Sequence, residues 1–281
     1  MKLHGCNCGI VKYADGHYEF QSRERVIDIA SDNYGFALAL SNTDYMDLFD
    51  DIHFTDHLAV YGEWCGGNVQ KGVAISGLPK MWVIFAVKVD GVYKRIEDFT
   101  HLQINRQNIY NITQFEHYSI DIDFNQPEVA QNKMVEITQQ VEASCPVGRF
   151  FGKDGVGEGV VWEHINSAER YIFKVKGEKH SVTKVKKLAS INIEELNGIR
   201  EFVEYAVTEN RLQQGLTKMV EMGKTIEPST TGDYIRWVFN DVIKEEPDTI
   251  IKNQIDVKKL GSEVSKKARE FWMKELNKII S

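Results

Sequence analysis

Three residues at the start of the chain could together perform a nucleophilic reaction on a phosphate. Lys2, His4 and Asn7 are the first, third and sixth residues of the segment Lys-Leu-His-Gly-Cys-Asn. A lysine amine attacks phosphorus only when it is neutral, so its ordinary pKa of about 10.4 has to be lowered by nearby cations or by burial. Because such a short pattern arises by chance in many chains, it gains weight only from the residues that follow it.

Further candidate residues follow in order along the chain. They are Arg23 in Gln-Ser-Arg, Glu63 in Tyr-Gly-Glu-Trp-Cys-Gly-Gly, Phe85 in an apolar run, Glu158 in Gly-Glu-Gly-Val-Val-Trp, and Lys174 and Lys176 in Lys-Val-Lys. Basic side chains bind phosphates, carboxylates bind Mg²⁺ together with phosphate oxygens, and an aromatic ring can stack on a base. Taken singly, each residue is ordinary for a core or a strand surface. Their joint occurrence in this order favours a nucleotide site.

Two other chemical interpretations of the sequence are weaker. Cys6 and Cys8, with His53 and His57, are candidate zinc ligands, but structural zinc sites normally separate a cysteine pair by about two to four residues. Lys153 begins the string Lys-Asp-Gly, which lacks the residue that nucleotidyl-transfer signatures place after the lysine. We therefore expect a plain turn at Lys153 and no zinc site.

The composition is that of a soluble protein with enough apolar material for a core. The 281 residues are 42% hydrophobic and 27% charged, which excludes disordered and collagen-like classes, and their number favours two domains. No apolar run approaches the roughly 20 residues of a membrane helix, and the N-terminus lacks the apolar stretch of a secretory signal. With only 4 cysteines, a reducing compartment such as the cytoplasm is expected.

Positive charge is concentrated in one segment of an acidic chain. The net charge of −7 argues against a protein that coats nucleic acid through bulk attraction. Between positions 170 and 187, however, Glu178 is the single acid among seven basic residues, which are Arg170, Lys174, Lys176, Lys179, Lys184, Lys186 and Lys187. This segment could form a basic groove that follows phosphates, and the alternative is a solvated edge strand whose lysines prevent aggregation.

The hydrophobic pattern divides the chain into a strand-rich part and a helical part. Short β-branched and aromatic runs predict strands over 18–21, 58–62, 81–89, 159–162 and 171–176, with hairpin turns at 15–16 and 90–91 and one helix over 128–143. After residue 190, helical periodicity predicts helices over 193–207, 209–222, 230–246 and 257–279. The predicted domains are therefore 1–188 and 193–281.

The ordered residues resemble the motifs of a known superfamily. They are similar to motifs I, Ia, III, IIIa, IV and V of the covalent nucleotidyltransferases, which include ATP-dependent ligases and capping enzymes. Because His4 stands where DNA ligases and capping enzymes have Asp, the chain most resembles the bacteriophage T4 RNA ligase 2 family, although Cys6 replaces that family's usual Thr. The resemblance implies an α+β fold, with a mainly antiparallel-sheet nucleotidyltransferase core followed by a small all-helical C-terminal domain.

The resemblance also implies roles in an ATP site that contains Mg²⁺ or Mn²⁺. Lys2 would accept AMP, His4 would orient pyrophosphate, and Phe85 would stack on adenine. The implied catalytic residues are Lys2, His4, Glu158, Lys174 and Lys176. The residues implied to bind the nucleotide are Lys2, Asn7, Arg23, Glu63, Phe85, Glu158, Lys174 and Lys176. The implied metal ligands are Glu158 and Glu63.

The implied activity is an ATP-dependent RNA ligase that repairs RNA by sealing 3′-OH/5′-phosphate nicks in duplex RNA or an RNA-containing duplex. Such a duplex is recognised by shape, phosphates and 2′-OH groups. By resemblance, Arg211, Asp241 and Glu245 would engage the nick, and the basic Lys179 and Lys184 would contact phosphates; the alternative for the first three is a helix cap and surface ion pairs. A cytoplasmic monomer without membrane or protein partners is expected, and a phage-encoded protein in a host cytoplasm fits equally.

Two alternatives to an RNA ligase are open, and the start of the chain leads to a separate expectation. A DNA ligase or mRNA guanylyltransferase shares the core, although His4 and a helical tail disfavour both. A nucleic-acid-binding remnant that no longer adenylates is the other alternative. Because Met1 alone precedes Lys2, where the family has some tens of residues, we expect the genuine reading frame to extend upstream by about one helix and one strand.

Overall fold

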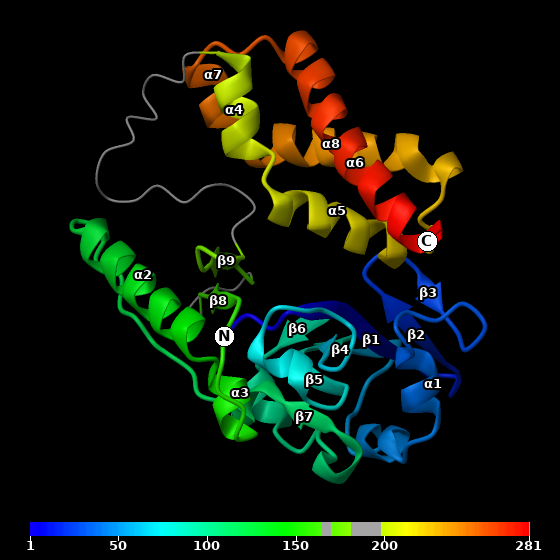
Figure 1. Ribbon diagram of the computed structural model, residues 1–281. Coiled ribbons are helices and arrows are strands. Elements are labelled where there is room, and N and C mark those ends of the chain that lie inside the picture. The colour runs from blue at the N-terminus through cyan, green and yellow to red at the C-terminus, as the bar shows by residue number, and fades with distance from the viewer. Residues whose placement is uncertain (165–169, 181–197, 281) are drawn as a thin grey trace. The chain divides into compact units, whose positions relative to one another are not determined.

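The computed structural model describes residues 1–164, 170–180 and 198–280, which form two compact units (Figure 1). Unit 1 spans Met1–Lys179 and combines antiparallel strands with a few helices. Unit 2 spans His180–Ser281, and its described residues contain helices. This architecture confirms the predicted α+β fold class with a helical C-terminal part.

A large sheet organises unit 1. Its antiparallel strands follow the order β3 (Val26–Ile27), β2 (Tyr18–Ser22), β1 (Gly5–Tyr13), β4 (His57–Cys65), β5 (Met81–Val89) and β6 (Val92–Lys94), and β7 (Ile109–Asn111) pairs in parallel with β5. The strands predicted over 18–21, 58–62 and 81–89 are confirmed. The sequence analysis did not predict β1, because Gly5, Asn7 and Gly9 are poor strand formers.

A second, two-stranded sheet lies against the longest helix of unit 1. β8 (Gly159–Glu163) pairs antiparallel with β9 (Ile172–Lys176), which confirms both predicted strands. Ile137 and Val141 of α2 (Pro127–Ala143) pack with Val160 and Trp162 of β8. The remaining helices are α1 (Phe36–Ser41) and α3 (Pro146–Phe150), with 3₁₀ turns at Tyr45–Phe49, Ala74–Gly77, Ile96–Phe99, Asn105–Gln107 and Ile112–Gln114.

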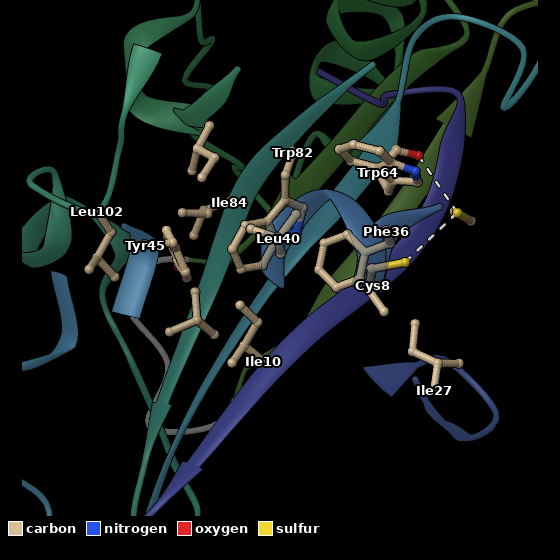
Figure 2. Packing of buried hydrophobic residues seen from close by; sticks show 14 of the residues in the cluster. Cys8, Ile10, Ile27, Phe36, Leu40, Tyr45, Trp64, Trp82, Ile84 and Leu102 are labelled. Atoms are coloured by element: carbon tan, nitrogen blue, oxygen red, sulfur yellow. Dashed lines mark hydrogen bonds between the residues drawn. The ribbon is translucent and has the colours of Figure 1, made fainter. Parts of the chain in front are cut away.

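The two faces of the large sheet have different surroundings. Figure 2 shows one face, where apolar side chains from the strands, α1 and the first 3₁₀ turn form a core; among them are Cys8, Ile10, Phe36, Tyr45, Trp64, Trp82 and Ile84. Burial of each large side chain contributes about 1.5 to 3 kcal/mol, so this face anchors the sheet. Because side chains alternate along a strand, Asn7 and Glu63 lie on the opposite face.

A β-bulge in β5 changes the direction of Phe85. Pairing with β4 passes from Tyr61 opposite Ala86 to Gly62 opposite Ile84, so Phe85 is the extra residue. Ile84 and Val87 both belong to the core although they are three residues apart. The two residues between them therefore lie toward the polar face of the sheet.

Unit 2 is built from five helices in its described part. They are α4 (Ile199–Ala206), α5 (Glu209–Glu221), α6 (Thr231–Glu245), α7 (Pro247–Lys252) and α8 (Val257–Ile280), with a 3₁₀ turn at Pro228–Thr230. Trp272 of α8 stacks on Tyr234 of α6 at 4.5 Å between ring centroids, in the centre of the core.

The observed helices differ from the predicted ones at two places. Residues 193–197, predicted as the start of the first helix, lie outside the described residues. The helix predicted over 230–246 is followed directly by α7, which begins at Pro247, because proline fits the first helical position, where no N–H donor is needed. Within the part of the chain that the structure describes, no helix combines the length and the apolar composition of a membrane span.

Candidate active site

Glu158 is the centre of a cluster of ion pairs in unit 1. Its side chain is only 2% exposed, and its Oε2 lies 2.5 Å from Nζ of Lys2 and 3.1 Å from Nδ1 of His4. Nζ of Lys176 lies 3.7 Å from Oε1. The basic side chains remain 15% to 24% exposed. The cluster therefore joins a buried carboxylate to cations that solvent and ligands can reach.

Backbone contacts hold the elements of this cluster together. The N–H of Lys2 donates to the carbonyl of Gly159 at 2.7 Å, which places the start of the chain beside β8. Gly159 pairs with Lys176 in the β8–β9 hairpin. Gly159 has a φ of 146°, and a Cβ there would lie 2.2 Å from the carbonyl oxygen of Val175. Glycine is therefore required next to Glu158.

Glu63 lies on the polar face of the large sheet, near the cluster. It is directly opposite Asn7 of β1, so the two side chains share a face. Its Oε1 accepts a 3.1 Å hydrogen bond from the N–H of Gly5. A Cβ on Gly5 would lie 3.0 Å from Cγ of Glu63 and 2.3 Å from the carbonyl oxygen of Trp64. The absence of a side chain at Gly5 thus permits this contact.

Phe85 and Arg23 reach the same face from other strands. Phe85 is partly exposed at the bulge of β5. Arg23 follows β2, two residues after Gln21, which pairs with Gly9 of β1. Arg23 is exposed, and its positive charge acts on the carboxyl group of Glu63. The polar face therefore presents an aromatic ring, a carboxyl group and a guanidinium.

The cations around Glu158 keep it ionised. Burial alone would raise the pKa of this carboxyl group, but the hydrogen bond with His4 and the charges of Lys2, His4 and Lys176 outweigh burial and hold the pKa below its usual range. Glu158 is thus a carboxylate at neutral pH, and it compensates the positive charge of its neighbours.

Glu63 responds differently to its surroundings. Burial raises the pKa of its carboxyl group from 4.5 to about 7; the charge of Glu158 adds to this rise, and the charges of Lys2, Arg23 and Lys174 oppose it. Burial also lowers the pKa of the Lys174 amine, and the charges of Lys2 and Arg23 lower it further, against the two carboxyl groups. The site therefore contains one carboxylate that is ionised at neutral pH, Glu158, and one, Glu63, that gains or loses its proton near neutrality.

Comparison with known proteins places this chain in a family. A family model described as RNA ligase matches residues 1–176, which include every residue of the cluster. The chain belongs to the RNA ligase family. A solved structure described as Naegleria gruberi RNA ligase with PPi is similar, with 14% sequence identity and a TM-score of 0.41, and the match covers 63% of this chain and 48% of that one. The chain thus spans about half the length of that protein, and a search of curated proteins gave no match.

A divalent metal ion is a further group that the resemblance implies. Among residues 1–164, 170–180 and 198–280, no three His, Cys, Asp or Glu side chains form a preformed metal cluster. Mg²⁺, however, typically takes only one or two carboxylates and completes its shell with substrate phosphates and water. Glu158 and Glu63 are close enough for the charge of one to raise the pKa of the other. This pair of oxygen donors therefore fits Mg²⁺ or Mn²⁺ that binds together with a nucleotide.

The structure brings most of the residues singled out from the sequence to one place. Lys2, His4, Glu158 and Lys176 are in contact, Lys174, Glu63 and Arg23 act on one another through their charges, and Asn7 and Phe85 share the polar face. The roles of Gly5 and Gly159 were not expected from the sequence. Gly5 directly follows His4 and Gly159 directly follows Glu158, and this adjacency to site residues could have indicated both glycines. Lys179 is anchored through its backbone N–H, which donates to Glu142 at 2.7 Å, and Lys184 lies outside the described residues.

Arg211 lies in unit 2, in a very different environment. Its side chain is 0% exposed, with Nε 2.9 Å from Oδ2 of Asp241 and Nη2 3.5 Å from Oε1 of Glu246. Nη1 donates to the carbonyl of Ala206 at 2.5 Å. Glu245 is exposed, and its neighbour Glu246 is the acid that contacts Arg211. Glu245 was selected from the sequence for engaging the nick, and this role stays a prediction; Glu246 was not selected, because motif spacing alone does not show which acids are buried.

Proposed function

We propose that this member of the RNA ligase family is an ATP-dependent ligase that seals 3′-OH/5′-phosphate nicks in RNA through a lysyl-AMP intermediate. The observation that carries the proposal is the contact of Lys2 with the buried, ionised Glu158, beside the cation of Lys176. This arrangement combines a nucleophile, positive charge for a triphosphate and a carboxylate for a metal ion.

In the first step, the neutral amine of Lys2 attacks the α-phosphorus of ATP. A nitrogen–phosphorus bond forms, the bond to the bridging oxygen of pyrophosphate breaks, and the amine loses its proton. Lys174 and Lys176 stabilise the negative charge on the phosphates, and His4 orients the leaving pyrophosphate. Nζ of Lys2 forms an ion pair with Oε2 of Glu158 at 2.5 Å, so this contact must be released for the attack.

The polar face of the sheet would bind the rest of the nucleotide. Phe85 stacks on adenine, while Asn7 and Arg23 contact the ribose and the AMP phosphate. A divalent metal ion, when bound, supplies positive charge against the phosphate oxygens. Glu158 and Glu63 would hold this ion.

Two further phosphoryl transfers complete the reaction. An oxygen of the RNA 5′-phosphate attacks the phosphorus of lysyl-AMP, which regenerates Lys2 and leaves an adenylated 5′ end. The 3′-OH then attacks the phosphorus of that 5′-phosphate, forms the phosphodiester and releases AMP. In both steps the protein contributes mainly positioning and charge neutralisation.

Incubation with labelled ATP or GTP and Mg²⁺, followed by denaturing electrophoresis, tests the proposal. We expect a covalent label from ATP, which a nicked RNA duplex discharges as sealed product. A label from GTP would indicate a guanylyltransferase, and preferential sealing of nicked DNA would indicate a DNA ligase. The absence of any label would contradict the proposal and favour the alternative of a nucleic-acid-binding protein that does not adenylate.

A further inference from the structure

The polar face of the large sheet continues beyond the proposed nucleotide site. Tyr61 lies two residues from Glu63 on β4, about 7 Å along the strand and on the same face. Ala86 of β5 lies opposite Tyr61, and Lys88, two residues further along β5, therefore has its side chain on the same face. Tyr93 of β6 lies directly opposite Lys88. A continuous row of side chains therefore leads from the site toward the edge of the sheet.

Two cations lie against the ring of Tyr93. Nζ of Lys88 is 5.5 Å from the ring centroid, and the guanidinium carbon of Arg170 is 4.9 Å from it. Two hydrogen bonds of 2.9 and 3.1 Å to Glu163 fix the plane of the Arg170 guanidinium. Tyr93 is nevertheless 45% exposed, and Tyr171, the residue after Arg170, is 58% exposed.

The tyrosines of this face lie close to one another. Partial burial raises the pKa of Tyr61, and the hydroxyl groups of Tyr93 and Tyr13 raise it further. A Cβ on Gly9 would lie 2.6 Å from a ring carbon of Tyr61, so the ring lies directly against the backbone of β1. The ring of Tyr61, held against the backbone of β1, therefore offers a fixed aromatic surface beside the nucleotide site.

We propose that Lys88, Tyr93, Arg170 and Tyr171, here named the tyrosine–cation strip, bind unpaired nucleotides of an RNA strand that continues beyond the nicked duplex. The inference rests on the proposed function and specifies its substrate as a nicked duplex with a single-stranded extension. Unpaired bases stack on aromatic rings and on guanidinium planes, whereas bases inside a duplex do not expose their faces. Lysine and arginine beside the rings neutralise the phosphates between those bases.

The test is a binding titration of metal-free protein with a fluorescent 5′-phosphorylated single-stranded RNA. We expect Tyr93→Ala to weaken binding by about fivefold to a hundredfold, the range for loss of one base–aromatic stack. Tyr93→Phe should bind nearly as the wild type does, because the ring remains. Lys88→Ala should reduce the slope of log K against log salt by about 0.7, the value for one phosphate contact on a single strand.

Val92→Ala is the matched control. Val92 is the neighbour of Tyr93 on β6 and is 57% exposed, but it pairs with Val89, which packs on the core side of the sheet. This variant should bind RNA within twofold of the wild type. Equal affinity of Tyr93→Ala and wild type would overturn the proposal, as would an equal loss in Val92→Ala. If Tyr93→Ala does not fold, as judged by thermal unfolding, the exposed Tyr171→Ala takes its place.

Two further measurements separate this inference from the proposed function. Wild-type self-adenylation tests the proposed function alone, because it needs no RNA. If the wild type is labelled by ATP and Tyr93→Ala binds RNA normally, the inference fails and the proposed function stands. A paired competitor tests the substrate class: a blunt nicked duplex that competes as well as the same duplex with a single-stranded extension would show that the strip does not select unpaired bases.

Discussion

Two buried charge clusters among the described residues differ in their surroundings. In unit 1 the buried residue is an acid, Glu158, and its basic partners keep 15% to 24% of their surface exposed. In unit 2 the buried residue is a base, Arg211, which has 0% exposure and lies between acids that are 15% and 9% exposed. The first cluster is open on its cationic side, and the second encloses its cation.

This difference indicates different roles for the two clusters. Cations that reach solvent can exchange a carboxylate for the phosphates of a ligand with little additional desolvation. An enclosed guanidinium cannot reach a ligand without breaking contacts that compensate its burial, and removal of one partner of such a group typically costs about 3 to 5 kcal/mol. The Glu158 cluster therefore fits ligand binding, and the Arg211 cluster fits stabilisation of the helical unit.

The largest expected effect is that of Lys2→Ala on the open cluster. No other side chain can replace the attacking amine, so covalent labelling by ATP should fall to background, and sealing of a 5′-phosphate nick should stop. Sealing of a pre-adenylated nick should persist, because that step needs no lysyl-AMP. The matched control is Lys153→Ala, which removes an exposed lysine and should retain the label. Labelling of Lys2→Ala at the wild-type level would exclude the assignment of the nucleophile.

Arg211→Ala tests the enclosed cluster. It leaves Asp241 and Glu246 without their cation, so the free energy of unfolding should fall by about 3 to 5 kcal/mol, as measured by thermal or urea unfolding. Lysyl-AMP formation should remain, because the contacts of Lys2 lie within unit 1, while nick sealing should be lost.

A triple variant separates stability from catalysis in this second cluster. Arg211→Met with Asp241→Leu and Glu246→Leu replaces the charges by apolar side chains of similar size and should recover most of the lost stability. If the triple variant regains both stability and nick sealing, the cluster has a structural role alone. Sealing that stays absent in the stable variant would show that Arg211 takes part in the later steps.

Gly159→Ala tests whether the open cluster depends on backbone geometry. A side chain at a φ of 146°, 2.2 Å from the carbonyl oxygen of Val175, should destabilise the protein by about 1 to 3 kcal/mol and displace Glu158 from Lys2. Thermal unfolding and the rate of self-adenylation measure the two effects. Gly77→Ala is the control, since a Cβ there meets no atom within 4 Å. Equal behaviour of both variants would refute this role for Gly159.

The last expected effect is a pH dependence of stability caused by Glu63. Because its pKa rises from 4.5 to about 7 on folding, the folded protein binds this proton more tightly than the unfolded chain does. The free energy of unfolding should therefore fall as the pH rises from about 4.5 to about 7, and this contribution should stay constant above that range. Urea unfolding of Glu63→Gln should lack this part of the fall. Parallel pH profiles of the two proteins without metal would contradict the assignment.

The sequence by itself determined the elements and the chemical inventory of the site. Strong periodicity predicted the strands at 58–62 and 81–89 and the long helices, because an apolar face has to be buried whatever the tertiary context. The order of the motifs led to the RNA ligase family, which the family model confirms over residues 1–176. These properties depend on local pattern and residue type, which a sequence shows directly.

Tertiary structure decided which of these residues meet and in which state. Lys2 and Glu158 are far apart in the sequence, and a backbone hydrogen bond to Gly159 brings them together. The bulge at Phe85 and the raised pKa of Glu63 arise from strand register and burial. The enclosure of Arg211 likewise depends on helices that contact it across the core. The physical reason is that register, desolvation and charge–charge distance are set by long-range packing, which no local pattern encodes.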